Sequence, residues 1–139
     1  TYVGPRVATL TDPEGGVQRW TYDYDRVKRQ FVNVHRSAAG VERERVYSID
    51  GTLLRETVGS RTVYRLVRDG TNVEIAFDER GQRTRTVFDS NRNPLEVTHP
   101  DGTTVTTAFH PVLNRPVQVT DEAGVITTMR YDAAGRLLE

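Results

Sequence analysis

The three histidines are the residues best suited to metal binding or proton transfer: His35, His99 and His110. A metal site requires further ligands at close spacing, such as a second histidine or a pair of cysteines. None of the three has a partner at such a spacing, and the chain contains no cysteine. His99 and His110 each precede a proline, which favours an extended or turn backbone. We therefore expect no metal site, and we predict that the histidines lie in solvated strands or loops.

The hydroxyl side chains give no sign of nucleophilic catalysis. The serines are Ser37, Ser48, Ser60 and Ser90, and none of them lies in a Gly-x-Ser-x-Gly sequence. Scattered single residues do not define a set of serine, histidine and aspartate that could act together. We expect no catalytic residue, no cofactor and no enzymatic activity.

The aspartates are numerous enough to suggest an acid/base pair or a calcium site: Asp12, Asp23, Asp50, Asp69, Asp78, Asp89, Asp101, Asp121 and Asp132. None of them belongs to the Asp-x-Asp-x-Asp-Gly loop that binds calcium. They fall instead in turn sequences or directly after an aromatic residue, where a carboxylate accepts hydrogen bonds from nearby backbone N–H groups. We predict that these aspartates stabilise turns.

Aromatic residues recur at a fixed distance from glycines. A glycine precedes a tyrosine or phenylalanine by seven residues at Gly15/Tyr22, Gly40/Tyr47, Gly70/Phe77, Gly81/Phe88, Gly102/Phe109 and Gly124/Tyr131. With 11 glycines, 6 tyrosines and 4 phenylalanines in 139 residues, chance would give about one such pair, so the chain is a repeat array. Rings that recur at one strand position either stack in a ladder across strands or, if exposed, bind sugars. We favour the ladder; an exposed Trp20, which shares its face with Tyr22, would favour sugar binding.

The segments that carry these rings are predicted to be short antiparallel strands. Turn sequences such as Asp50-Gly51, Asp69-Gly70 and Asp101-Gly102 recur along the whole chain, and no segment between them shows the apolar period of a helix. The fold class is therefore all-β, an array of hairpins in a curved or spiralling sheet. Gly59-Ser60 is predicted to be a two-residue turn that joins strands at 53–58 and 61–67.

The period predicts which side chains share a face of each strand. Positions three, five and seven after the glycine, such as Val105, Thr107 and Phe109, form the more apolar face, and the alternate positions form a face that water can cover. Arg43 and Arg45 share the face of Tyr47, so there either the apolar layer thins or the charges pair across strands. Both alternatives remain open. Segments 26–40 and 52–69 fit the repeat poorly, and we expect strands to bend or leave the regular ribbon at 26–40 and at Gly59-Ser60.

Composition excludes several classes of partner. The chain has 19 basic and 19 acidic residues, so no net positive charge attracts nucleic acid or an anionic membrane. No apolar run reaches the roughly 18 residues of a membrane helix, and residues 1–30 do not resemble a signal peptide. We expect no nucleic-acid binding and no membrane insertion. We interpret residues 1–139 as a single repeat array cut from a longer chain, because the first residues already lie inside a unit.

The last repeat resembles a known family. The sequence YDAAGRLL at 131–138, which contains Asp132, Gly135 and Arg136, is similar to the signature of the Rhs family, whose units are also called YD repeats. The stretch from Thr120 to Glu139 resembles a complete unit, and weaker echoes begin at Tyr22, Tyr47, Phe77 and Phe88. The resemblance covers most of the chain and is strongest over 70–139. The chain departs from the pattern where Arg26, Arg92 and Leu113 replace the glycine four residues after the aromatic.

The resemblance implies a structural function. In the proteins that this sequence resembles, YD repeats form a β-ribbon that spirals into a hollow shell, which in bacterial polymorphic toxins and in the C component of Tc toxins encloses a toxic C-terminal domain. The family's self-cleavage uses a block of aspartates after the repeats, which this chain lacks. The resemblance therefore implies a secreted or cell-surface bacterial casing segment, whose partners are the rest of the shell and the enclosed toxin domain.

Two further kinds of partner are expected from the sequence. The alternative function is an adhesion or glycan-binding module, as the YD repeats of teneurins suggest, with a glycan as the ligand. An array cut from its parent also has unpaired strand edges, which invite self-association with another copy.

Overall fold

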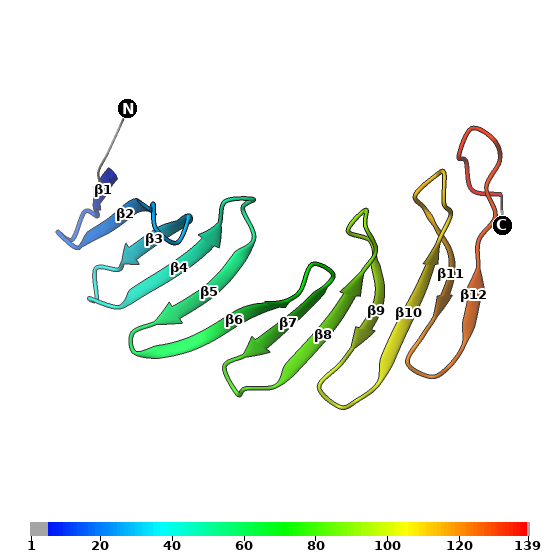
Figure 1. Ribbon diagram of the computed structural model, residues 1–139. Coiled ribbons are helices and arrows are strands. Elements are labelled where there is room, and N and C mark those ends of the chain that lie inside the picture. The colour runs from blue at the N-terminus through cyan, green and yellow to red at the C-terminus, as the bar shows by residue number, and fades with distance from the viewer. Residues whose placement is uncertain (1–5, 139) are drawn as a thin grey trace. The chain divides into compact units, whose positions relative to one another are not determined.

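The computed structural model describes residues 6–138, which form twelve β-strands and no helix (Figure 1). The strands are β1 (Arg6–Thr11), β2 (Val17–Asp25), β3 (Gln30–Arg36), β4 (Glu42–Ser48), β5 (Leu53–Val58), β6 (Arg61–Asp69), β7 (Val73–Asp78), β8 (Arg83–Phe88), β9 (Pro94–Thr98), β10 (Thr104–Phe109), β11 (Pro116–Thr120) and β12 (Ile126–Thr128). The all-β prediction is confirmed. Residues 6–138 contain no helix long and apolar enough to cross a membrane.

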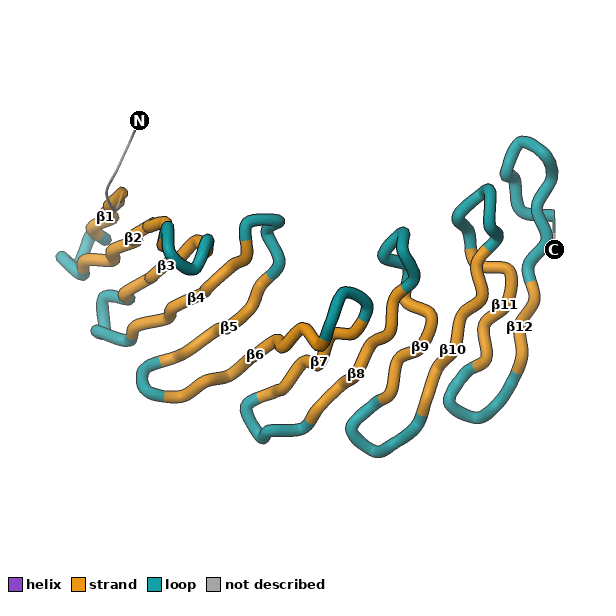
Figure 2. The backbone as a smooth tube through the Cα atoms, in the orientation of Figure 1, coloured by secondary structure: helices purple, strands orange, loops and turns teal. Residues whose placement is uncertain are grey.

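The strands lie in the sheet in the order in which they occur in the sequence, β1 to β12. Pairs of successive strands are antiparallel, from β1 with β2 at one end to β11 with β12 at the other. Figure 2 shows the resulting path, in which strands alternate with short loops. Short loops favour this order, because a tight turn can only return the chain beside the strand that it has just left.

The chain divides into two compact units. The first unit comprises residues up to Leu66 together with Phe77–Gly81, and the second comprises Val67–Ala76 together with the residues from Gln82 onward. The first unit contains β1 to β5 and most of β6, and the second contains β8 to β12. Each unit is therefore a set of consecutive hairpins.

One loop design joins most of the strands. At Asp121 the N–H donates to the Val125 carbonyl at 3.0 Å, and the Gly124 N–H donates back to the Asp121 carbonyl at 3.0 Å. Gly124 has a φ of 81°, the left-handed conformation that closes a three-residue hairpin loop. The same pair of backbone bonds begins at Asp12, Ser37, Ser48, Asp89, His99 and Asp132. The repeated glycine is thus the loop residue that must adopt a positive φ.

Three loops adopt a positive φ without glycine. Arg92, which replaces the repeat glycine, takes the left-handed conformation itself, with a φ of 66°. Arg26 and Leu113 do not, because the loops that hold them are longer and the positive φ falls at Arg29 (55°) and Asn114 (53°). The loops therefore accommodate the loss of glycine in two ways: the new residue adopts the strained positive φ, or the loop is longer and another residue adopts it.

Replacing Arg29 with glycine should stabilise the protein. A left-handed conformation costs an ordinary residue roughly 1–2 kcal/mol, whereas glycine adopts it without strain but loses more entropy on folding. We expect Arg29→Gly to raise the free energy of unfolding by about 0.5–1 kcal/mol in urea denaturation. Arg26→Gly, in the same loop but without a positive φ, is the matched control and should lower it. Equal effects of both changes would contradict this account of the loop.

The hairpin expected at Gly59-Ser60 is confirmed. Val58 pairs with Arg61 in the register of β5 and β6, which leaves two residues in the turn. Gly59 has a φ of 59°, and Ser60 has no positive φ, the pattern of a type II′ turn. A register shift follows between Glu56 and Thr57, so the strands are irregular beside the turn.

The expectation that segment 26–40 departs from the ribbon is wrong. Its residues 30–36 form β3, which pairs with β2 and with β4 over its whole length without a register shift. The segment lacks the glycine spacing, but its alternation from Phe31 to His35 suits a strand, and pairing on both sides determines its conformation.

A β-bulge recurs beside the repeat aromatics. The register shifts between Val46 and Tyr47, between Val87 and Phe88, and between Ala108 and Phe109. Phe88 and Phe109 then lie opposite Pro94 and Pro116, the prolines that begin the returning strands. Proline is tolerated at strand starts and bulges because no ladder hydrogen bond is lost there.

The described residues hold almost no buried apolar side chain. Val46 is the single hydrophobic residue of 6–138 that counts as buried, with 6% of its surface exposed. It lies on β4 between Val32 and Arg55 in register, and Arg55 pairs with Glu44 on the same face at 2.7 Å. The units are therefore held together mainly by strand pairing, loops and contacts across strands.

Candidate functional site

The repeat aromatics lie where the period places them, but they do not form the expected ladder. Tyr22 is on β2 and Tyr47 on β4, while Phe88 is on β8 and Phe109 on β10. An intervening strand separates the members of each pair, so their backbones lie at least about 9–10 Å apart. No two of the repeat rings stack on each other within residues 6–138. The ladder prediction is wrong: an intervening strand separates Tyr22 from Tyr47 and Phe88 from Phe109, and Phe77 and Phe88, on consecutive strands, do not stack either.

Arginines cover three of these rings instead. The guanidinium carbon of Arg65 lies 4.3 Å from the centre of the Phe77 ring, and that of Arg92 lies 4.1 Å from the centre of Phe88. Arg115 lies 5.6 Å from the centre of Tyr131. A guanidinium over an aromatic face gains electrostatic attraction and keeps its polar edge in water. Cation–π contacts thus replace ring stacking in the repeat.

The C-terminal repeat shows how the signature residues act together. The Tyr131 hydroxyl donates to the Pro116 carbonyl at 2.8 Å, which ties the repeat to β11. Asp132 Oδ1 accepts the N–H groups of Ala134 and Arg136, and Arg136 Nε donates to the other carboxylate oxygen at 2.7 Å. Gly135, with a φ of 76°, is buried beside Arg115. Tyr131, Asp132, Gly135 and Arg136 therefore build a turn and not a reactive cluster.

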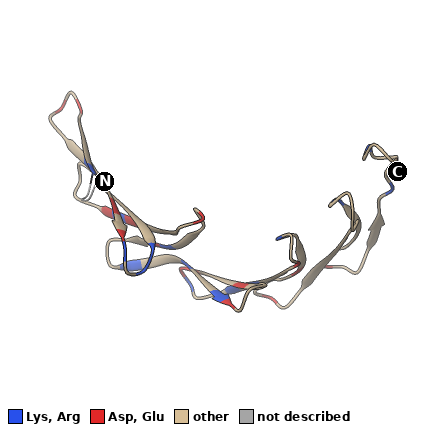
Figure 3. Ribbon diagram, turned by 45° about the horizontal axis from the view of Figure 1, so that its top comes forward, with Lys and Arg blue, Asp and Glu red and all other residues tan. Residues whose placement is uncertain are grey.

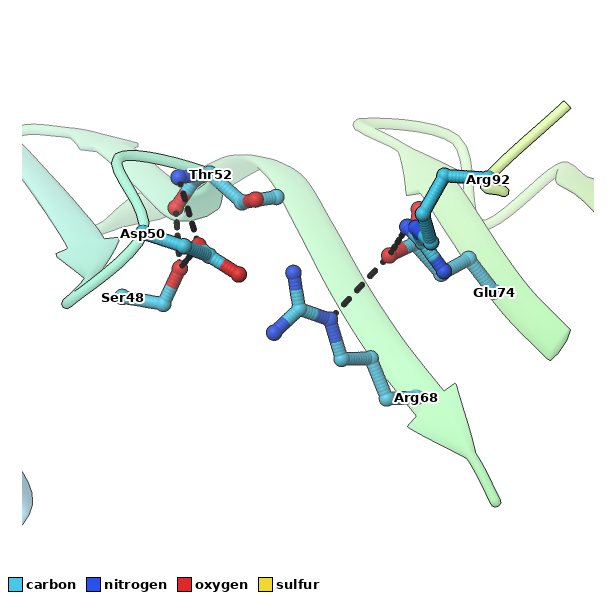
Figure 4. A network of polar contacts seen from close by, with 6 residues as sticks. All are labelled: Ser48, Asp50, Thr52, Arg68, Glu74 and Arg92. Atoms are coloured by element: carbon cyan, nitrogen blue, oxygen red, sulfur yellow. Dashed lines mark hydrogen bonds and ion pairs between the residues drawn. The ribbon is translucent and has the colours of Figure 1, made fainter. Parts of the chain in front are cut away.

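A shared carboxylate connects β7 to two arginines of the second unit. Glu74 Oε1 accepts from Arg68 Nε at 3.1 Å and from Arg92 Nη2 at 2.5 Å, and the Glu74 side chain is only 14% exposed (Figure 4). The Phe88 N–H also donates to the Asn72 carbonyl at 2.7 Å. Arg92 therefore contributes to an ion pair and a cation–π contact from a strained loop position.

The aspartates act as turn acceptors, as predicted. Asp89 Oδ1 accepts the N–H groups of Asn91 and Asn93, each at 2.9 Å, and Asp121 accepts those of Ala123 and Val125. In the turn after β4, Ser48 hydrogen-bonds Asp50, whose carboxylate also accepts the Thr52 N–H (Figure 4). These contacts hold the turns in their observed conformation.

Four turn aspartates have a lowered pKa. The Lys28 N–H lowers the pKa of Asp25, and the Asn93 side chain lowers that of Asp89. The Thr103 hydroxyl lowers the pKa of Asp101, and the Arg136 N–H lowers that of Asp132. A carboxyl with a lower pKa in the folded than in the unfolded chain stabilises the fold above its unfolded pKa, and that stabilisation is lost as the pH falls through the folded pKa.

The protein should therefore lose stability in acid. We expect the free energy of unfolding to change little between about pH 5 and 7 and to fall below about pH 4, where the unfolded aspartates become protonated. Urea denaturation at a series of pH values measures this. Asp132→Asn, which cannot ionise, should flatten the acid branch relative to wild type. A stability that rises between pH 5 and 3 would contradict the turn role.

The histidines lie apart from one another. His35 stacks on Trp20 in the sheet, with ring centres 4.9 Å apart. His99 Nε2 lies 3.0 Å from Glu122 Oε1 in a neighbouring turn, and His110 Nδ1 accepts the N–H groups of Val112 and Leu113 in its own loop. In the part of the chain that the structure describes, no three of His, Asp or Glu are placed to hold a metal ion.

A concentration of exposed and half-buried aromatic side chains in the first unit is the best candidate for a binding site. Trp20, Tyr22 and Tyr24 alternate along one face of β2, and their partners in register on β3 are His35, Asn33 and Phe31. Tyr47 of β4 lies opposite Phe31. Tyr22, Tyr24 and Phe31 are 44%, 37% and 44% exposed. We call this surface, formed by Trp20, Tyr22, Tyr24, Phe31, Asn33, His35 and Tyr47, the aromatic groove.

The aromatic groove contains two adjoining hollows. One, of about 480 Å³, lies among Tyr22, Tyr24, Phe31, Asn33 and Tyr47. The other, of about 510 Å³, shares Tyr22, Asn33 and Tyr47 with the first and continues past Trp20 and His35 to the arginines of β4. The two hollows thus adjoin at Tyr22, Asn33 and Tyr47, which line both of them.

The charges on the same face are paired with each other. Arg43 Nη1 and Arg45 Nε both donate to Glu56 Oε1 at 3.0 Å. This decides between the two alternatives for Arg43 and Arg45: the charges pair across strands with β5. Figure 3 shows basic and acidic residues interleaved on the strands of this unit. The aromatic groove is therefore an apolar surface with a polar rim and no large net charge.

The glycine spacing marks only Tyr22 and Tyr47 of this surface. Tyr24 and Phe31 lie outside the seven-residue rule, yet the four-residue loop that follows Asp25 brings them opposite each other, with ring centres 4.9 Å apart. The alternation of aromatic residues from Trp20 to Tyr24 is the sequence signal that marks the face.

Comparison with known proteins identifies the C-terminal repeat. Residues 112–139 match the family model described as RHS Repeat. This match confirms the resemblance drawn from the signature at Tyr131–Arg136, and it covers the turn whose hydrogen bonds are described above. A search of curated proteins finds no match to the chain.

Proposed function

The chain carries a repeat of the Rhs (YD-repeat) family, and from that premise we propose that it is a wall segment of a bacterial toxin's β-shell, without enzymatic activity. In this role the repeats surround a C-terminal toxin domain during delivery. The protein acts outside the producing cell, as a secreted or cell-surface molecule. Its partners are the remaining repeats of the shell and the enclosed domain.

The observation that carries this proposal is the unbroken order of the strands. Twelve strands follow one another through the sheet in sequence order, each joined to the next by a short loop. Such a sheet can be lengthened by adding hairpins at either edge without changing the existing pairs. Among residues 6–138 the sheet also has almost no buried side chains, which suits a wall better than an independent domain.

Limited proteolysis of the full-length parent protein tests the casing function. If the repeats enclose the terminal domain, that domain should resist protease in the parent and be digested when it is expressed alone. A parent that carries Val34→Pro, which interrupts a central strand, should lose this protection, whereas Val34→Ala should keep it. Equal digestion of the terminal domain in the intact parent and in isolation would refute containment.

A binding module is the second candidate function, and the exposed aromatic groove favours it. A glycan is the ligand class that the sequence suggests, since aromatic rings pack against the apolar faces of sugars. A glycan array with the purified segment tests this candidate. Binding that is lost in Phe31→Ala but kept in Thr21→Ala, on the other face of the sheet, would support it.

A further inference from the structure

The aromatic groove presents hydrogen-bond donors whose protein partners are missing. Within residues 6–138, no protein group bonds the indole N–H of Trp20, the hydroxyls of Tyr22, Tyr24 and Tyr47, or the side-chain amide of Asn33. These groups lie on two hollows of about 480 and 510 Å³. An indole N–H can only donate, and a phenol or amide can do so readily. The surface is thus prepared for a ligand rich in acceptors.

Two rings of the groove are stacked on each other. Trp20 and His35 are stacked with an angle of 14° between their planes and 4.9 Å between their centres. That distance equals the spacing of neighbouring strands, so the two rings stand on adjacent strands and cover one face of each other. The stack therefore leaves at most one face of each of these two rings for a ligand.

The charged groups on the groove also favour a ligand rich in acceptors. Arg43 and Arg45 share one carboxylate oxygen of Glu56, so two positive charges face a single negative one. The remaining guanidinium N–H groups can donate to carbonyl or other oxygens of a ligand. The one carboxylate among the residues of the first hollow, Asp23, already accepts the Tyr24 N–H at 2.7 Å. Carboxylate acceptors on the first hollow are therefore limited to this one side chain.

We propose that the aromatic groove binds a proline-rich peptide segment in the polyproline II conformation. Such a segment has carbonyl oxygens that are not bonded internally, and its prolines have no N–H that would need an acceptor. Its rigid rings lose little entropy when they pack against aromatic side chains, which is how aromatic-lined grooves recognise proline-rich ligands. The inference rests on the second candidate function, that this surface binds a ligand, and names the ligand class.

The length of the groove fits a short peptide. Trp20 and Tyr24 are four residues apart on β2, a distance of about 13 Å along the strand. A polyproline II helix advances about 3.1 Å per residue, so about four residues span the groove. The Trp20–His35 stack covers one face of each of those rings, whereas Tyr22, Tyr24 and Phe31 are 44%, 37% and 44% exposed. The groove is therefore long enough for about four residues of a polyproline segment, with exposed rings for its prolines to pack on.

Trp20 offers a local signal for the test, because it is the only tryptophan in the chain. A decaproline peptide should change the Trp20 fluorescence in a saturable manner, and a glycine-serine peptide of equal length should not. Tyr22→Phe and Tyr24→Phe remove only a hydroxyl and should each weaken binding about fivefold, the effect of one lost hydrogen bond. Thr21→Ala, on the opposite face, should bind as wild type does.

The same titration with a set of neutral and sulfated oligosaccharides distinguishes two claims: that the groove binds a ligand, and that this ligand is a proline-rich peptide. A response to an oligosaccharide but not to decaproline would overturn the peptide inference and leave a binding module. No response to any of these probes would overturn both. Binding of decaproline that is unchanged in both Tyr→Phe variants would also overturn the inference, because the hydroxyls would not contribute.

Discussion

The Val34→Pro variant should lose about 3 kcal/mol or more of its free energy of unfolding. Val34 lies in the middle of β3, where it pairs with Thr21 of β2 and Glu44 of β4. An inner strand donates every N–H to one neighbour or the other, so proline removes a ladder hydrogen bond and leaves a backbone acceptor unpaired. This is a large fraction of the roughly 5–15 kcal/mol that stabilises an ordinary domain.

Val34→Ala is the matched control, because it shortens the same side chain and keeps the N–H. It should cost only about 1 kcal/mol, since Val34 is half-buried. Urea denaturation followed by circular dichroism gives the overall loss, and Trp20 fluorescence reports on the neighbouring strand. If the proline and alanine variants lose equal stability, β3 is not paired on both sides and the order of strands is wrong.

The Phe109→Ala variant should lose about 2 kcal/mol. Complete burial of a phenylalanine makes its loss cost about 3–5 kcal/mol, and Phe109 is half-buried at the bulge opposite Pro116. The stabilisation comes from packing at the bulge, since the ring does not stack on the next repeat aromatic. The loss should appear in the midpoint of urea denaturation with little change in slope.

Thr106→Ala tests whether the stabilisation depends on the face of the sheet that carries Phe109. Thr106 lies on the same strand, is exposed and points to the other face, so its loss should cost less than about 0.5 kcal/mol. Equal small losses in the two variants would mean that the repeat aromatic does not stabilise the sheet.

The loops could be predicted from the sequence because their chemistry is local. Gly59-Ser60 and Asp121 to Gly124 determine their turns through φ angles and carboxylate hydrogen bonds within five residues. The strand β3 was mispredicted because its pairing depends on β2 and β4, and the glycine spacing carries no information about them. Turns can thus be predicted from the local sequence, whereas strand pairing cannot be predicted in segments that lack turn residues.

The predicted ladder of aromatic rings is absent from residues 6–138 for a geometric reason. Counting residues gives the position of a ring along a strand but not how many strands lie between two rings, and here a strand lies between Phe88 and Phe109. Arg65, over Phe77, lies outside the repeat pattern, and Arg92, over Phe88, is marked by the pattern only as a replacement of the repeat glycine, so neither could be selected from the sequence as the partner of a ring. The aromatic groove depends in the same way on register, which places Tyr24 opposite Phe31.

Self-association remains a prediction for the isolated segment. β1 is an outer strand with the exposed side chains Val7 and Leu10, and β12 is the outer strand at the other end of the order. Unpaired strand edges favour association with further strands. In the proposed casing, neighbouring repeats would cover these edges.

Electron cryomicroscopy of the full-length parent protein tests the central claim most directly. The account predicts a closed shell of β-strands in sequence order, with the segment described here as part of its wall and separate density for a domain inside. A map in which the repeats form an open sheet and the terminal domain lies outside it would contradict the proposal that this chain is a casing.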